Sequence, residues 1–179
     1  MVSRRQFLRG RLDRRPQAIR PPWSGTDTDF LVRCTRCDAC QPVCPSHIIV
    51  RGDGGYPEVD FRRGECTFCA ACVDACQAHA LAVRDADGMR QPWRLKAHIG
   101  DTCFAHHGIV CRTCGDVCAP GAIRFTAAPS APDATAIAHP AVLEANCTGC
   151  GACLAPCPAN AITLATPTRS IGVVIPEAP

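Results

Sequence analysis

Cysteine is the residue type in this chain whose number and spacing could do chemistry. There are 16 cysteines in 179 residues, and they fall into four groups of four with none left over. The first, second and fourth groups share the spacing C-x2-C-x2-C-x3-C, the run that bacterial proteins use to bind a [4Fe-4S] cubane. The spacing therefore predicts four [4Fe-4S] clusters, held by Cys34, Cys37, Cys40, Cys44, Cys66, Cys69, Cys72, Cys76, Cys103, Cys111, Cys114, Cys118, Cys147, Cys150, Cys153 and Cys157.

The fourth cysteine of each group is expected to bind a neighbouring cluster, as it does in two-cluster ferredoxins. Pairing neighbouring groups is the simplest arrangement. It joins Cys34, Cys37 and Cys40 with Cys76; Cys66, Cys69 and Cys72 with Cys44; Cys103, Cys111 and Cys114 with Cys157; and Cys147, Cys150 and Cys153 with Cys118. The alternative pairs the first group with the fourth and the second with the third, which would merge the two halves of the chain.

The third group departs from the shared spacing, because seven residues, Phe104 to Val110, separate its first two cysteines. A longer loop can still deliver Cys103 to the same corner of a cluster, so a fourth cluster is expected here too. His106 and His107 lie in this gap, and we interpret them as loop residues rather than ligands.

Other uses of cysteine fit less well. Structural zinc sites normally take two C-x2-C pairs separated by a longer loop, whereas here three cysteines stand within seven residues. Disulfides between such close cysteines would close short strained loops. The sequence also has no phosphate-binding glycine-rich loop, no serine-histidine-aspartate pattern and no dinucleotide fingerprint, so we expect one-electron transfer rather than enzymatic catalysis.

Short apolar runs follow and precede the motifs, and they are expected to be strands that position the cluster loops. The runs are Ile48 to Val50, Tyr56 to Phe61, Ala80 to Val83, Trp93 to Ile99, Ala122 to Phe125, Ala141 to Leu143 and Ala161 to Leu164. Each x3 segment with its lead-in is expected to form one helical turn. The predicted fold class is α+β, with tandem bacterial ferredoxin-like modules, short strands and helical turns around the clusters, and little regular secondary structure.

These expectations divide the chain into four segments. They are a basic arm (1–28), a dicluster module (29–90), a second dicluster module (91–168) and a tail (169–179). Aromatic residues make up only 5 % of the chain. We expect metal ligation to supply folding free energy that a thin apolar core cannot.

The arm carries seven arginines before Trp23 against one aspartate, so it is formally +6, while the whole chain is +3. Ser3 to Leu8 looks like a twin-arginine export motif, but no apolar run follows it. Without such a run, and with no stretch of membrane-spanning length, we expect a cytoplasmic protein with no membrane span. Stacking aromatics beside the charge are few, so nucleic-acid binding is not expected.

The segments Ser3-Arg4-Arg5-Gln6-Phe7-Leu8-Arg9-Gly10 and Ile19-Arg20-Pro21-Pro22-Trp23, followed by the cysteine motifs, resemble the NapF family of ferredoxin-type proteins from periplasmic nitrate reductase systems. The likeness spans nearly the whole chain. It implies a cytoplasmic accessory protein whose partner is the precursor of the molybdenum-containing nitrate reductase catalytic subunit, and which assists maturation of that subunit before export. Electron supply and cluster assembly remain open, as does an alternative in which the chain is an electron-relay subunit with no assembly role.

Overall fold

The computed structural model describes residues 18–86, 88–126 and 137–167. Most of the predicted arm (1–17) and the tail (169–179) lie outside the described residues. Regular structure is sparse, as predicted. The helices are α2 (Asp27–Arg33), α3 (Ala71–Asp74) and α4 (Thr113–Asp116), with 3-10 turns η1 (Asp53–Gly55) and η2 (Phe104–His107). The strands are β1 (Ile49–Arg51), β2 (Pro57–Val59), β3 (Arg84–Asp85), β4 (Gly88–Met89), β5 (Lys96–Ile99), β6 (Ile123–Thr126), β7 (His139–Val142) and β8 (Ile162–Ala165).

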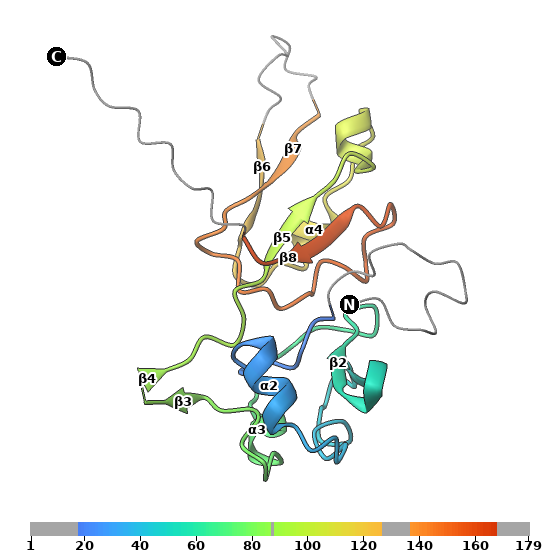
Figure 1. Cartoon of the computed structure of the whole chain (residues 1–179). Helices are drawn as coiled ribbons and strands as arrows, with labels where there is room; N and C mark the ends of the chain where they lie inside the picture. Colours follow the sequence, from blue (N-terminus) through green and yellow to red (C-terminus); the bar gives the residue numbers. More distant parts are fainter. Residues whose placement is uncertain (1–17, 87, 127–136, 168–179) are drawn as a thin grey trace, which may run out of the picture.

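The elements form two groups that follow one another along the chain. Figure 1 shows the first group in its lower half and the second in its upper half. We call α2 to β4 the first module and β5 to β8 the second module. In the first, β1 pairs with β2 and β3 with β4; in the second, β5 pairs with β8 and β6 with β7, all antiparallel. Each β1–β2 or β6–β7 hairpin connects one cysteine motif to the next, so each module contains two motifs.

Most of the expected strands are present, with ends shifted by one to three residues. The exception is the run Ala80 to Val83, which forms no strand, although Ala80 and Leu81 are buried as expected of a core segment. Its neighbour in space is the segment Ile19 to Trp23. The Ala82 amide donates to the Trp23 carbonyl at 3.1 Å, and the Val59 amide donates to the Ile19 carbonyl at 2.7 Å. This segment lies beside the residues that follow the second motif, as β5 lies beside β8 after the fourth motif. Pro21 and Pro22 have no amide hydrogen to donate, so no regular pair of strands forms here.

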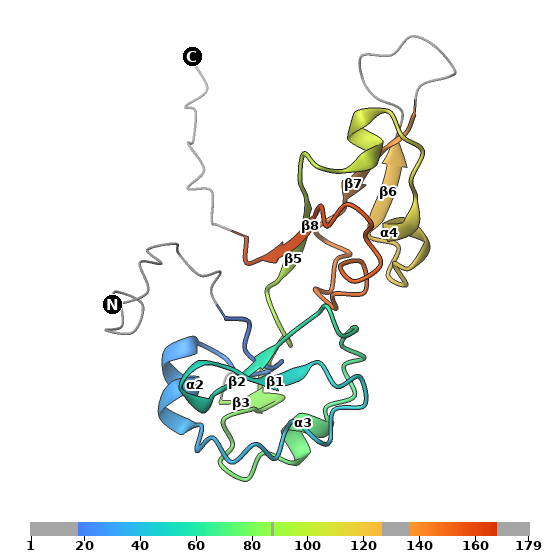
Figure 2. The same ribbon diagram turned by 90° about the vertical axis from the view of Figure 1, so that its right-hand side faces the viewer.

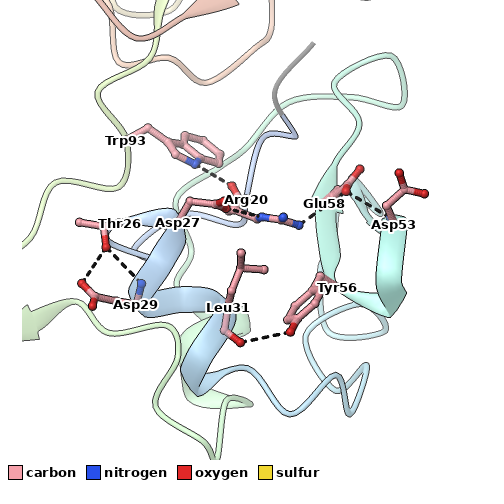
Figure 3. A network of polar contacts seen from close by, with 9 residues as sticks. All are labelled: Arg20, Thr26, Asp27, Asp29, Leu31, Asp53, Tyr56, Glu58 and Trp93. Carbon is pink, nitrogen blue, oxygen red and sulfur yellow. Dashed lines mark hydrogen bonds and ion pairs between the residues drawn. The ribbon is translucent and has the colours of Figure 1, made fainter. Parts of the chain in front are cut away.

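Residues 18–24 therefore pack on the first module, although the sequence grouped them with the basic arm. Trp23 is buried, and Pro21 is among the most buried side chains. Figure 3 shows how Arg20 is held: its Nε donates to Asp27 Oδ1 at 2.8 Å, and its Nη1 lies 3.5 Å from Glu58 Oε1. Only six of the seven arginines remain in the part of the arm before residue 18.

Helix α2 was not expected, and it positions the first cysteine motif. Thr26 caps its N-terminus, accepting from the Asp29 amide at 3.2 Å. Asp27 and Asp29 place negative charge in the first turn, where the helix dipole favours it. The helix buries Phe30 and is capped at its C-terminus by Cys34, whose amide donates to the Phe30 carbonyl at 2.9 Å. The pattern Thr-x-x-Asp before an apolar pair is a helix-start signal that the sequence did contain.

Candidate functional site

Two cavities are each lined by four cysteines. One cavity, of about 370 Å³ including the part open to solvent, is lined by Cys34, Cys37, Cys40 and Cys76 together with Phe30 and Leu81. The other, of about 350 Å³, is lined by Cys103, Cys111, Cys114 and Cys157 together with Ile99 and Ile162. Each cavity thus takes three cysteines from one motif and the fourth from the neighbouring motif. The pairing of neighbouring motifs that the sequence favoured is the one that brings these sulfurs together.

The remaining cysteines also gather by motif. Cys66 and Cys72 lie close to Cys44 and Cys69; burial raises the pKa of Cys66 and Cys72, and the neighbouring sulfurs add to this. Cys147 and Cys153 belong to one buried cluster with Cys118. In the described residues no three or more His, Cys, Asp or Glu side chains are grouped closely enough to hold a single metal ion. Eight of the sulfurs are placed around the two cavities, which is the arrangement that a larger inorganic core requires.

Short helices and left-handed loop residues present the sulfurs. Helix α3 carries Cys72 and α4 carries Cys114, so the predicted helical turns are present in the second and third motifs; the first and fourth have only hydrogen-bonded turns there. Positive φ angles at Arg36, Asp38, Phe68 and Ala70 curl the first and second loops. Such angles are uncommon for residues other than glycine, so these loops store some backbone strain.

Hydrogen bonds from the backbone reach several sulfurs. The Ala122 amide donates to Cys118 Sγ at 3.2 Å, and the Ala161 amide donates to Cys157 Sγ at 3.4 Å. Both donors follow their cysteine by four residues. The Phe68 amide donates to Cys66 Sγ at 3.4 Å. Amide donors stabilise negative charge on sulfur, and they are one means by which a protein sets the potential of an iron-sulfur cluster.

Burial sets the protonation of the free thiols. It raises the pKa of Cys40, Cys66 and Cys114 to about 11, and that of Cys72 and Cys153 to about 12, with smaller contributions from the other cysteines. Cys37 is exposed, and hydrogen bonds from the Ala39 backbone and the Thr35 side chain lower its pKa. The buried sulfurs are therefore unsuited to carrying charge alone at neutral pH. Bound iron would supply the compensating positive charge.

The long gap of the third motif folds as a compact turn. Phe104 to His107 form η2, and Gly108 reverses the chain with a φ of 77°. His107 Nε2 lies 2.7 Å from the Asp101 carbonyl oxygen, and the rings of His106 and His139 are tilted against each other with centroids 5.2 Å apart. Neither histidine lines the cavity, whereas Cys103 does. The gap thus brings Cys103 to Cys111 and Cys114, as expected.

The second module holds its last motif through Lys96. This β5 residue donates from Nζ to the carbonyl oxygens of Glu144 and Cys147, both at 2.6 Å. Lys96 was not predicted to be important, because an isolated lysine in a short strand gives no recognisable sequence signal. Within residues 18–86, 88–126 and 137–167, no helix is both long and apolar enough to cross a membrane.

Comparison with known proteins agrees with this geometry. Residues 33–81 and 109–161 each match a family model described as a 4Fe-4S dicluster domain. Two such domains account for four [4Fe-4S] clusters, and the cysteines around the cavities fit them. The predicted cofactor and the predicted tandem ferredoxin-like fold are confirmed.

Similar proteins cover nearly the whole chain. It is 45 % identical over 162 residues to the ferredoxin-type protein NapF of Escherichia coli K12, covering 90 % of this chain and 93 % of that protein. It is 46 % identical over 173 residues to the ferredoxin-type protein NapF of Haemophilus influenzae, covering 91 % and 93 %. It is 30 % identical over 166 residues to the methylamine utilization ferredoxin-type protein MauM of Paracoccus denitrificans, covering 88 % and 74 %.

Proposed function

Because the chain belongs to the NapF family of ferredoxin-type proteins, we propose that it is a cytoplasmic accessory protein that assists maturation of the periplasmic nitrate reductase catalytic subunit before export. Its two 4Fe-4S dicluster domains make it an iron-sulfur electron-transfer protein. The higher identity to the NapF relatives than to MauM favours the nitrate reductase system over methylamine utilization.

The sixteen cysteines are assigned as the ligands of the four clusters. The observation that supports this assignment is that each of two cavities is lined by three cysteines of one motif and the fourth cysteine of its neighbour. The ligand sets are Cys34, Cys37, Cys40 and Cys76; Cys66, Cys69, Cys72 and Cys44; Cys103, Cys111, Cys114 and Cys157; and Cys147, Cys150, Cys153 and Cys118. When bound, the clusters accept and donate single electrons.

The protein's own residues prepare these sites. Buried apolar side chains such as Phe30 and Leu81 exclude water from the first cavity, and Ile162 does so in the other. The backbone amides of Ala122 and Ala161 stabilise charge on Cys118 and Cys157. The exposed Cys37 and Cys69 put both cluster sites of the first module within reach of an external electron donor or acceptor.

The partner is the catalytic subunit in its cytoplasmic precursor form, and the arginines before residue 18 supply charge for docking. A pull-down of the precursor with purified, cluster-loaded protein tests this. We expect the precursor to be retained, and we expect a variant with Arg4 and Arg5 changed to glutamine to retain less of it. An exposed arginine within the fold, Arg94, gives the matched control, Arg94→Gln. No binding by the intact loaded protein would overturn the partner assignment, and equal retention by the Arg4 and Arg5 variant would overturn the docking role of these arginines.

A relay role without assembly is the second candidate, and the series of cysteine groups through both modules favours it. A strain lacking the protein separates the two. Under the maturation proposal, the exported catalytic subunit is expected to lack part of its metal cofactors. Under the relay alternative, it is fully loaded but stays oxidised when physiological electron donors are supplied, and recovers activity with an artificial donor.

A further inference from the structure

The fourth motif differs from the first two at its two left-handed loop positions. In the first, second and fourth motifs, φ is positive at the residues two and four positions after the first cysteine of the motif. In the first and second motifs these positions hold Arg36 and Asp38, and Phe68 and Ala70. In the fourth they hold Gly149 and Gly151, with φ of 74° and 84°. Since the same backbone accepts side chains in the other motifs, backbone conformation alone does not explain the two glycines.

The first module and the segment that follows it explain them. A Cβ built on Gly151 would lie 2.0 Å from Phe61 Cδ1, and one built on Gly149 would lie 2.7 Å from the Leu95 carbonyl oxygen. Both distances are shorter than any real Cβ contact. Phe61 is itself fixed, being buried and packed edge-on against Trp93 with ring centroids 5.5 Å apart. The fourth motif therefore lies directly against the body of the first module.

A backbone hydrogen bond crosses the same contact. The Cys66 amide, in the second motif, donates to the Cys150 carbonyl oxygen, in the fourth, at 2.8 Å. Leu154, also in the fourth motif, packs against the hydrophobic cores of both modules. The contact thus joins the loop that begins the second cysteine group to the loop that carries the fourth.

We infer that Gly149 and Gly151 are positioning residues that seat the fourth motif on the second, so that the four clusters form one continuous path. The order in the path is first, second, fourth and third motif. This inference rests on the proposed ligand assignment and not on the proposed partner. Each internal step moves one electron from a reduced cluster to its oxidised neighbour, so one is oxidised as the other is reduced, and no bond or proton is exchanged.

The neighbours within each module complete the path. In the first module, Cys72 lies close to Cys40 as well as Cys44, which connects the first two groups. In the second, Cys153 lies close to Cys114 as well as Cys147 and Cys150, which connects the last two. The contact around Gly151 is therefore the single junction that the path needs between the modules.

The test uses the loaded, full-length protein and the substitution Gly151→Ala, with Gly54→Ala as the matched control. Gly54 also has a left-handed φ, 67°, but a Cβ there would meet Tyr56 at an ordinary 3.4 Å. Iron per chain is measured first. Hydrogen exchange of the peptide containing the Cys66 amide then reports the contact, and the electron paramagnetic resonance spectrum of the dithionite-reduced protein reports magnetic interaction between clusters. Interactions within each module are common to all variants, so a change in the spectrum isolates the junction.

We expect Gly151→Ala to keep its iron, to exchange the Cys66 amide at least tenfold faster, and to lose part of the interaction broadening. Gly54→Ala should match the parent in all three. Adding Phe61→Ala to Gly151→Ala removes the ring atoms that the new Cβ would meet and should restore part of both signals. Unchanged exchange and spectrum in Gly151→Ala, or faster exchange with an unchanged spectrum, would overturn the continuous path. A parent protein without iron would instead overturn the ligand assignment, and a failed pull-down would affect neither measurement.

Discussion

The indole of Trp93 donates a hydrogen bond from Nε1 to the Arg20 carbonyl oxygen at 3.0 Å, although the two residues are 73 positions apart (Figure 3). Trp93 also lies edge-on to Phe61 and Phe68. The segment after the first module thus returns to the residues that precede it, and it closes the module around the second cysteine motif. Figure 2 shows the connection from this closure up to β5.

Replacing Trp93 by phenylalanine keeps much of the ring packing but removes the hydrogen bond. A net loss of about 1 kcal/mol is expected for such a bond, which corresponds to a midpoint lower by about 2–4 °C for a chain of this size. Bleaching of the cluster absorbance during heating at one fixed rate measures the change. Val32→Ala, at a side chain that is 83 % exposed, is the control. Equal midpoints for the parent and Trp93→Phe would show that the bond contributes nothing.

Arg20 holds the start of α2 to the β1–β2 hairpin, because its guanidinium bonds Asp27 and also lies 5.6 Å from the ring centroids of both Phe30 and Tyr56. Its Nη1 is buried and makes no hydrogen bond to any described residue. Arg20→Gln is expected to destabilise the first module by about 1–2 kcal/mol, a value reduced for the partial exposure of Asp27. Circular dichroism melting against Arg94→Gln measures it. Binding to the precursor subunit should be unaffected at temperatures where the variant is folded, unlike binding by the Arg4 and Arg5 variant.

The third motif is expected to need Cys103 and neither histidine. Cys103→Ser removes one thiolate from its cavity, so iron and acid-labile sulfide should fall by one cluster in four. His107→Ala removes only the contact with the Asp101 carbonyl and should retain all four clusters. Equal iron losses in the two variants would show that the histidine takes part in ligation.

Removing the clusters is expected to leave a largely unfolded chain. Cys44, Cys72, Cys103, Cys114 and Cys153 are among the buried core residues, so ligation free energy serves as folding free energy. Chelation of iron followed by far-ultraviolet circular dichroism measures the loss. A native spectrum after complete removal would contradict this expectation.

The pH dependence of any residual apo structure has a definite sign. Burial raises the pKa of Cys66 from 9.0 to about 11 and that of Cys72 to about 12 in the fold. The contribution of a raised pKa to stability is fully present when the pH is below the pKa of the unfolded chain. It is lost as the pH rises through the pKa of the folded chain. Structure left after chelation should therefore decline between about pH 9 and 12, when ellipticity is followed during a base titration. An ellipticity that does not change over that range would show that the thiols are not buried in the apo chain.

The cysteine spacing by itself determined the cofactor, the number of motifs and the tandem fold. A cubane needs sulfurs at fixed short separations, and residues that are close in sequence can provide them. The apolar runs located most strands for a similar local reason.

Tertiary structure decided the rest. Arg20 and Trp23 looked like part of a basic arm, yet they pack on the first module, because the partners that bury them, Glu58, Ala82 and Trp93, lie tens of residues away. The sequence provided no prediction for Gly149 and Gly151, because only their contacts with Leu95 and Phe61 show what a side chain there would meet. Contacts between distant segments leave no local pattern, so only the fold reveals them.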